Sequence, residues 1–367
     1  MKRLVPILLL IALLCACQKA QTDPTPTGTP AETPVVTPSP SQSPEPTPEP
    51  TATPEPTPAF YNPLTGEATQ TDISGARPAA VMMNNLKKAL PMYGVSTADI
   101  IYEAPAEGGI TRMLALWQDV SQVPRIGSVR STRAYYLDLM QGHDAILFHA
   151  GGSPEAYSLI ESRGLTTLDC VNGGWEGTLY WRDQDRIKNA GFEHSVFTSG
   201  ARMTWALESM DDTQHAAGYV EPLAFTDDAA PGGGLDALKI TLCYSDYKTG
   251  VFDYDAESGL YQVSEYAAAY LDGENAKQVC VKNVLVLLTD VSKIPGDTAG
   301  RLRITLTGGG KGYYACGGKY VEIKWSKSGP DAPFVYTLSD GTPLKLGRGK
   351  SYINIFPKEN SATFRNE

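Results

Sequence analysis

Arginines are concentrated in one stretch of the sequence, residues 99–155, where side chains could bind an anion. Guanidinium groups bind phosphate and carboxylate through paired, charge-assisted hydrogen bonds. Arg130 and Arg133 flank Ser131 at a predicted helix start, where free backbone N–H groups and the helix dipole also favour an anion. The stretch contains Arg112, Arg125, Arg130 and Arg133. The predicted anion or ligand site contains Arg112, Arg130, Ser131, Arg133, Gly151 and Gly152.

A second interpretation of the same arginines is structural. An acidic turn with Glu103 and Glu107 lies close by in the sequence, and Asp119 and Asp138 are also near. These carboxylates could pair with the arginines as ion pairs that serve the fold. The sequence leaves both interpretations open.

Three residues of this stretch are candidates for acid–base chemistry: His149, Glu103 and Glu107. Histidine titrates near neutral pH, and His149 ends an apolar run just before Gly151 and Gly152, whose N–H groups could stabilise an oxyanion. The alternative is a histidine that forms a hydrogen bond inside a tight turn. Ser153 is expected to cap a helix, because Pro154 follows it.

Other motifs point to no cofactor and no metal site. The glycines at 308–310 and 312 do not have the spacing of a phosphate-binding loop, and they favour a hairpin turn. Cys316 has no histidine after it to serve as a base. The chain has four histidines and no ligand spacing typical of a metal site.

Apolar patterns predict the elements that position these residues. Strands are expected at 77–84, 100–102, 111–117 and 145–149, and helices at 131–140, from Ser153 and at 199–210. After 211–236, which contains a Pro-Gly-Gly-Gly turn, the sequence pattern changes and predicts strands separated by turns. These strands are expected at 238–244, 251–254, 260–266, 283–289, 302–307, 319–325, 334–337 and 352–356.

The predicted fold class is therefore α+β, with two domains. An N-terminal mixed α/β domain is expected at 59–230 and a mostly β C-terminal domain at 235–360. The four cysteines after Cys17 have wide spacing, and we expect buried free thiols: Cys170, Cys243, Cys280 and Cys316.

Residues 1–17 are typical of a signal peptide. Lys2 and Arg3 precede the apolar run Leu4–Ala16, which is short for a membrane span. The ending Leu-Cys-Ala-Cys resembles a bacterial lipobox, which implies lipidation of Cys17. The alternative is an ordinary secretory signal with incidental cysteines. A diacylglycerol group has two acyl chains, enough for stable anchoring.

Residues 18–58 are predicted to be a disordered linker. The tract contains thirteen of the chain's 27 prolines and no apolar periodicity. Such a segment favours extended polyproline II and could span on the order of 100 Å. We expect it to be a solvated spacer.

The charge of the chain excludes nucleic acid as a partner. The whole chain carries −10; three basic residues and five acidic residues lie before residue 59, so the folded part keeps −8. Membrane association is expected through the lipid anchor only.

Several long motifs resemble one known family. In the first half they are NPLTG (62–66), RPAAVMMNN (77–85), ADIIYEAPAEGGITRMLALWQD (98–119), RIGSVRSTRAYYLDL (125–139) and DAILFHAGGSPEA (144–156). In the second half they are GGGKGYYACGGKYVEIKW (308–325) and SYINIFP (351–357). Together they resemble the YerB-like lipoproteins of Gram-positive bacteria. The resemblance implies a two-domain lipoprotein on the outer side of the cytoplasmic membrane, and it implies no reaction, because the family has no known function.

Two functions remain open at this stage. The first is a binding or scaffold module for a cell-envelope polymer or an envelope protein, which the absence of a catalytic motif favours. The second is an envelope hydrolase or transferase that acts on a phosphate- or carboxylate-bearing glycan through an Arg/His site. A deep cleft with His149 beside the arginines would favour the enzyme, whereas a buried salt-bridge cluster would favour the module.

Overall fold

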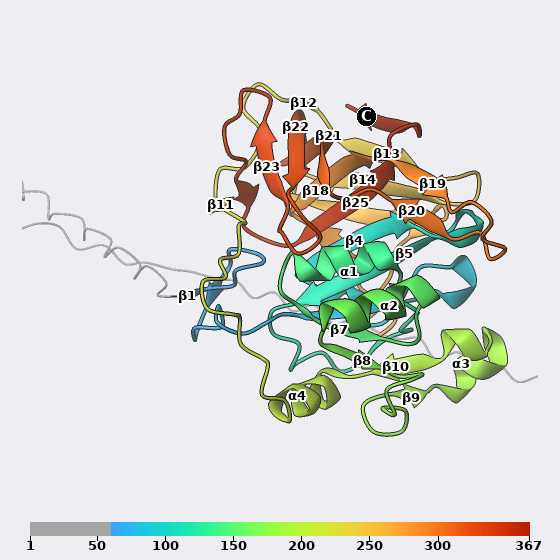
Figure 1. Ribbon diagram of the computed structural model, residues 1–367. Coiled ribbons are helices and arrows are strands. Elements are labelled where there is room, and N and C mark those ends of the chain that lie inside the picture. The colour runs from blue at the N-terminus through green and yellow to red at the C-terminus, as the bar shows by residue number, and fades with distance from the viewer. Residues whose placement is uncertain (1–59) are drawn as a thin grey trace, which may run out of the picture. The chain divides into compact units, whose positions relative to one another are not determined.

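One mixed sheet of eleven strands runs through both halves of the chain (Figure 1). The structure is a computed structural model that describes residues 60–367, so the predicted signal peptide, Cys17 and the linker lie outside the described residues. The first half contributes β3 (Ala79–Asn84), β4 (Ile100–Pro105), β5 (Thr111–Trp117), β7 (Ile146–His149) and β8 (Thr167–Asp169). The second half contributes β12 (Leu235–Asp236), β18 (Asn283–Thr289), β21 (Gly308–Cys316), β22 (Lys319–Lys327), β23 (Val335–Leu338) and β25 (Ser351–Pro357).

The two halves meet where β25 pairs with β4. The two strands are parallel, with Ser351 opposite Ile100 and Asn354 opposite Glu103, and β18 lies parallel to β25 on its other side. Backbone hydrogen bonds therefore join the halves directly, and residues 60–367 belong to one compact unit. The predicted domain boundary at 231–234 lies in the connection between the halves and stays a prediction.

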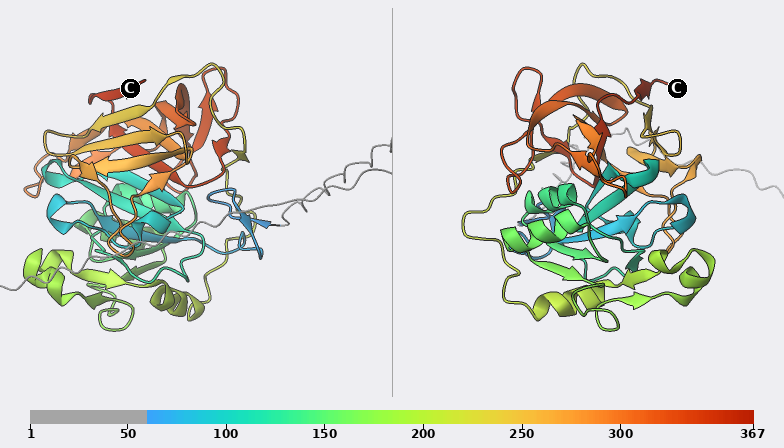
Figure 2. Two further views of the ribbon diagram at one scale, coloured as in Figure 1. Left: turned by 180° about the vertical axis from the view of Figure 1, so that it is seen from behind. Right: turned by 45° about the vertical axis from the view of Figure 1, so that its right-hand side comes forward.

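Helices and a second sheet cover the two faces of the large sheet. Strand side chains alternate between the faces, so Val284 and Val286 belong to one core while Leu285 and Leu287 belong to the other. The helices α1 (Ala134–Gln141) and α2 (Pro154–Arg163) pack on the second core (Figure 2).

The first core is closed by elements of both halves. In the first half it includes residues of β10 (Val196–Thr198) and of α4 (Gly200–Glu208). In the second half it includes residues of a six-stranded sheet. That sheet consists of β13 (Lys239–Cys243), β14 (Thr249–Asp255), β15 (Leu260–Glu265), β16 (Ala268–Ala269), β17 (Cys280–Val281) and β26 (Ala362–Arg365).

The remaining elements are short. A three-stranded sheet consists of β6 (Ile126–Gly127), β9 (Trp181–Arg182) and β10 (Val196–Thr198), and α3 (Gln184–Asn189) follows β9. Three strand pairs are β1 (Phe60–Tyr61) with β2 (Ala68–Thr69), β11 (Phe225–Thr226) with β24 (Leu346–Gly347), and β19 (Val291–Lys293) with β20 (Leu302–Ile304).

The described chain is mostly β-structure, as the sequence predicts for its second half. The four α-helices of residues 60–367 all lie between Ala134 and Glu208. The assignment of a separate α/β domain and a separate β domain stays a prediction, because one sheet crosses both halves.

The helix predicted from Ser131 begins later. Its first residue is Ala134 and its N-cap is Arg133, while the Ser131 hydroxyl donates to the carbonyl oxygen of Ala150. Ser131 therefore ties its segment to the end of β7 and does not cap a helix. The start of α2 is confirmed: Ser153 accepts a hydrogen bond from the Ala156 N–H, and Pro154 is the first helical residue.

The glycines at 308–312 do not form the predicted hairpin turn. They begin β21, which pairs with β22 from Gly308 opposite Lys327 onward. A Cβ on Gly310 would lie 2.8 Å from the Trp325 ring, and one on Gly312 would lie 2.6 Å from the Val286 carbonyl oxygen. Glycine is required here because neighbouring groups approach the backbone closely.

The prediction of free cysteines is confirmed for the described residues. Cys170 and Cys316 are buried, whereas Cys243 and Cys280 are half-buried, and none forms a disulfide.

Gly312→Ala should destabilise the protein by about 1–3 kcal/mol, because the new Cβ pushes β21 away from β18. Chemical denaturation measures this loss. Gly232→Ala is the matched control, since its Cβ would meet nothing within 4 Å. Equal stability of the two variants would contradict the close-approach role of Gly312.

Candidate functional site

Two arginines of the predicted site share one carboxylate, Glu107. Arg133 contacts it with two atoms: Nε lies 2.5 Å from Oε1 and Nη2 lies 3.1 Å from Oε2. Arg112 Nη2 lies 3.4 Å from Oε2. Glu107 belongs to a short turn (Glu107–Gly109) between β4 and β5, while Arg112 is on β5 and Arg133 caps α1.

Arg130 lies beside these groups without a carboxylate contact of its own. Its Nη1 donates to the backbone carbonyl oxygen of Glu193 at 2.7 Å. Burial, and then the charge of Arg112, lower the pKa of Arg130 to about 10. Burial and the charge of Arg133 likewise lower the pKa of Arg112. The three guanidinium groups therefore repel one another electrostatically. We call Arg112, Arg130, Arg133 and Glu107 the arginine cluster.

The arginine cluster carries more positive than negative charge. Burial opposes ionisation of Glu107, but the hydrogen bond from Arg133 and the charge of Arg112 hold its pKa below the usual value, so it is a carboxylate at neutral pH. Glu107 contacts Arg112 and Arg133, and the nearby charge of Glu193 acts on Arg130, so three guanidinium groups face two carboxylates. The Nε atoms of Arg112 and Arg130 are buried without a hydrogen-bond partner. The excess of positive charge produces a positive field, which attracts an anion.

Ser131 and Gly151 hold the backbone around the arginine cluster. The Thr132 N–H donates to the Gly151 carbonyl oxygen, and the Gly151 N–H donates to Asp169 Oδ1 at 2.7 Å. Gly152 forms a bridge with Thr132. The Gly151 N–H is therefore occupied, and the oxyanion role suggested by the sequence is wrong for it.

His149 does not line the surface of the arginines, although the sequence suggested it. Its side chain is fully buried, because β7 lies between β3 and β8 and α2 brings Tyr157 near the imidazole. Nδ1 lies 2.8 Å from the Gly151 carbonyl oxygen, and Nε2 has no partner. Burial lowers the pKa of His149, which keeps the ring neutral. The arrangement is the alternative considered above, a histidine bonded inside a tight turn.

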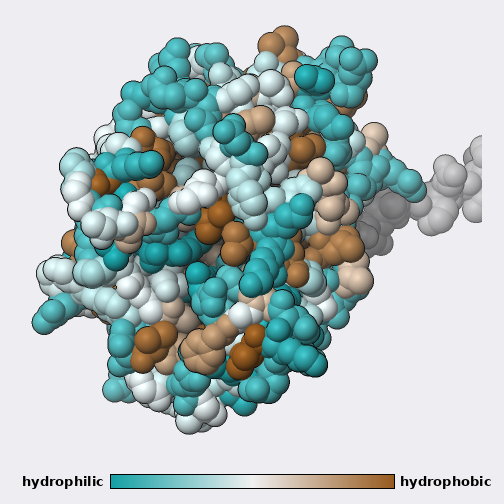
Figure 3. Space-filling model, turned by 90° about the vertical axis from the view of Figure 1, so that its right-hand side faces the viewer, coloured by the Kyte–Doolittle hydropathy of each residue, from teal (hydrophilic) through white to brown (hydrophobic). Residues whose placement is uncertain are grey.

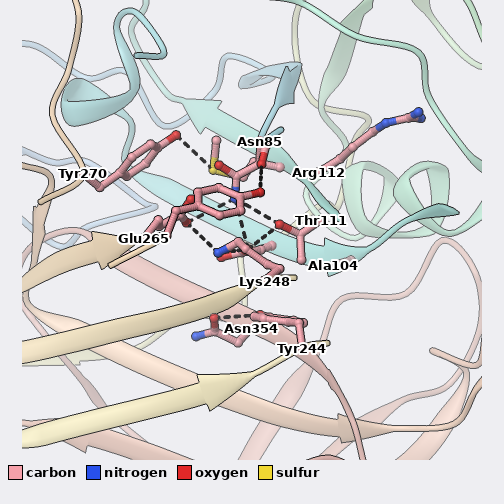
Figure 4. Close-up of polar contacts among 12 residues, drawn as sticks. Asn85, Ala104, Thr111, Arg112, Tyr244, Lys248, Glu265, Tyr270 and Asn354 are labelled. Atoms are coloured by element: carbon pink, nitrogen blue, oxygen red, sulfur yellow. Dashed lines mark hydrogen bonds and ion pairs between the residues drawn. The ribbon is translucent and has the colours of Figure 1, made fainter. Parts of the chain in front are cut away.

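Glu103 belongs to a different group, a buried ion cluster that the sequence did not predict. Lys248 Nζ lies 2.8 Å from Glu103 Oε1 and 3.0 Å from Glu265 Oε1, and all three side chains are almost completely buried. Figure 4 shows Lys248 beside Glu265, with the Arg112 side chain directed away from both. Arg112 and its neighbour Thr111 point to opposite faces of β5, which separates the two groups.

Uncharged side chains complete this cluster. Asn85 Nδ2 donates to Glu103, Thr111 and Glu265 at 3.0–3.1 Å. The Tyr352 hydroxyl donates to Glu103 Oε2 at 2.6 Å. Asn85, Glu103 and Thr111 come from the first half, and the other members come from the second. We call this group the buried lysine cluster: Asn85, Glu103, Thr111, Lys248, Glu265 and Tyr352.

Burial sets the protonation of the buried lysine cluster. It raises the pKa of Glu265 to about 7, although Lys248 opposes this shift. Burial disfavours the charged form of Lys248, but Glu103 and Glu265 outweigh it and raise its pKa. The cluster therefore contains a charged lysine and, in Glu265, a carboxyl group that titrates near neutral pH. The cluster is buried from solvent, and its ion pairs connect the two halves of the chain. The one local signal was the presence of Glu103 in the otherwise apolar strand β4.

Among residues 60–367, no group of three or more His, Cys, Asp or Glu side chains is arranged to bind a metal ion.

Comparison with known proteins identifies the family. Residues 64–213 match the N-terminal domain, and residues 240–353 the C-terminal domain, of a family described as "Protein of unknown function (DUF3048)". The chain belongs to the DUF3048 family. It is 35% identical over 311 residues to the "Putative lipoprotein YerB" of Bacillus subtilis (strain 168), which covers 82% of this chain and 87% of that protein.

A solved relative has the same fold. This chain matches the crystal structure of the YerB protein from Bacillus subtilis with a TM-score of 0.72 and 30% identity. The match covers 83% of this chain and 99% of the YerB chain. The resemblance to YerB-like lipoproteins is confirmed.

Glu265→Gln should weaken the dependence of stability on pH. Between the ordinary pKa of 4.5 and the folded value of about 7, the folded protein keeps a proton that the unfolded chain releases. Raising the pH through this window therefore destabilises the wild type, and the glutamine variant lacks this contribution.

Urea unfolding across the window measures the slope, with Glu257→Gln as the control because Glu257 is exposed. If Glu265→Gln and Glu257→Gln give the same slope as the wild type, the assignment of the retained proton to Glu265 fails.

Proposed function

We propose that this protein is a lipid-anchored binding module, outside the cytoplasmic membrane of a Gram-positive bacterium, that binds an anionic polymer of the cell envelope through the arginine cluster. The observation that carries the proposal is the excess of guanidinium groups over carboxylates around Glu107. An envelope protein with an anionic surface would bind the arginine cluster through the same charge interactions.

The arrangement favours a module over the alternative, an envelope enzyme with an Arg/His site. An acid–base catalyst must exchange its proton with the substrate or solvent. His149 has no exposed surface, and Glu103 is enclosed with Lys248. Glu107 has its pKa lowered beside two arginines, so it suits charge pairing better than proton transfer.

The surface is consistent with a hydrophilic partner. On the face drawn in Figure 3, hydrophilic residues predominate and hydrophobic residues gather only in small, separate groups. A protein that docks a large apolar partner normally has a contiguous apolar patch. This face therefore suits the hydrated polymers of a cell wall.

A lipid anchor would keep the module in the envelope. The relative is named a lipoprotein, and the residues before Cys17 resemble a lipobox. The proline-rich residues 18–58 would then space the folded part from the membrane. Within residues 60–367, none of the helices has the length and apolar character that crossing a bilayer requires.

Cys17→Ala should release the processed protein from the membrane fraction, because no acyl chains remain to anchor it. Cell fractionation with an immunoblot measures the distribution. Cys15→Ala is the matched control and should leave the protein in the membrane fraction. Retention of a processed Cys17→Ala protein would contradict the anchor.

Arg130→Ala should weaken polyanion binding about tenfold, because one of three guanidinium groups is lost. The loss of stability should be small, on the order of 1 kcal/mol, because Arg130 donates to a backbone carbonyl and leaves no carboxylate unpaired. Glu107→Gln should strengthen binding, because it removes the internal competitor for Arg112 and Arg133.

Calorimetric titration with polyphosphate and with polyglutamate tests this and separates phosphate from carboxylate recognition. Arg303→Ala is the control, since Arg303 is exposed on β20 outside the arginine cluster. The proposal fails if neither Arg130→Ala nor Glu107→Gln changes the affinity. It also fails if Arg130→Ala costs several kcal/mol of stability without a change in binding.

A further inference from the structure

A cavity of about 580 Å³ lies where three parallel strands end. Thr289 of β18, Pro357 of β25 and Pro105 of β4 are the last residues of their strands, and all three line it. The turn between β13 and β14, the pair β19–β20, the turn between β4 and β5 and residues 358–360 form the rest of the wall. Ligands of sheet proteins commonly bind at the carboxyl ends of parallel strands, and this volume is in the range of ligand pockets.

The wall of this cavity is held in place by both halves. The Ser245 hydroxyl donates to the Gly109 carbonyl oxygen at 2.5 Å, which ties the β13–β14 turn to the β4–β5 turn. Lys248 follows in the same turn and enters the buried lysine cluster. The cavity is thus preorganised, and less free energy is needed to order it when a ligand binds.

The charges of the cavity disfavour an anion. Asp290 pairs with Lys358 at 2.5 Å, so their charges offset each other. Asp246, Glu359 and Lys293 also line the cavity, and no ion pair of these three is present in the part of the chain that the structure describes. Two carboxylates and one ammonium group remain, which is the opposite balance to that of the arginine cluster.

The other lining groups suit a polyhydroxylated ligand. Tyr247 is 45% exposed, and the Tyr266 ring supports it edge-to-face at 5.4 Å between centroids. Ile110 and Leu302 add apolar contact area, and a Cβ on Gly108 would meet open space. A sugar ring has an apolar C–H face, which an aromatic ring can cover, and hydroxyl groups that both donate to carboxylates and accept from ammonium.

From this combination we infer that the cavity is a second binding site, for an uncharged saccharide. The site is separate from the arginine cluster and has the opposite charge preference. Tyr247 packs against the sugar face, and Asp246, Glu359 and Lys293 bind its hydroxyl groups.

Calorimetric titration of the full chain, in a detergent without a sugar headgroup, tests the inference with two neutral probes, cellotetraose and tetra-N-acetylchitotetraose. The wild type should bind at least one probe saturably. Tyr247→Ala should weaken that binding about tenfold, Tyr247→Phe should retain it, and Asp246→Ala should also weaken it. Thermal melts identify any variant that fails to fold.

Two control variants make the result specific. Tyr61→Ala removes another exposed tyrosine, on β1 outside the cavity, and should bind the sugar as the wild type does. Arg130→Ala should also bind it normally, so failure of the anion proposal and failure of this one are distinguishable. The inference is overturned if neither tetrasaccharide binds saturably, or if Tyr247→Ala and Tyr61→Ala bind the probe equally well.

Discussion

The ammonium group of Lys248, buried between Glu103 and Glu265, is the interaction on which the arrangement of the two halves depends. A charge without solvent is tolerated only when paired and hydrogen-bonded, so Lys248 restricts where Glu103 of the first half can lie relative to Glu265 of the second. The parallel ladder between β4 and β25 restricts the same strand through its backbone. Together, the ion pairs and the backbone ladder fix the register of β4 relative to the strands of the second half.

The turn that begins four residues after Glu103 contributes to both candidate binding surfaces. The turn that follows β4 presents Glu107 to Arg112 and Arg133, while Gly108 and Gly109 line the cavity at the strand ends. One short turn therefore contributes to a positively charged cluster and to a cavity with an excess of carboxylates. Any displacement of β4 would change both, which explains why a buried ion cluster lies directly before the turn.

The sequence predicted elements well where the signal is local. The apolar run of β18 and the Ser-Pro start of α2 were correct because burial and capping act on the residues themselves. β21 was missed because its glycines weaken any local signal, and the close approach of Val286 and Trp325 decides its structure. His149 was misjudged because its burial depends on β3, which pairs with β7 but comes from a distant part of the chain. Lys248 was missed for the same reason, since its partners are 145 and 17 residues away in the chain.

The buried lysine cluster also affects how many carboxylates face the arginines, because Glu103 of the same stretch belongs to it. Glu103 is the nearest acidic residue to Glu107 along β4, and on the arginine side it would have neutralised a second guanidinium group. Its side chain instead points to the opposite face of β4, into contact with Lys248 and Tyr352. The charge of the arginine cluster thus depends on the direction of Glu103. Its carboxylate pairs with Lys248, so Glu107 is the carboxylate of this stretch that pairs with Arg112 and Arg133.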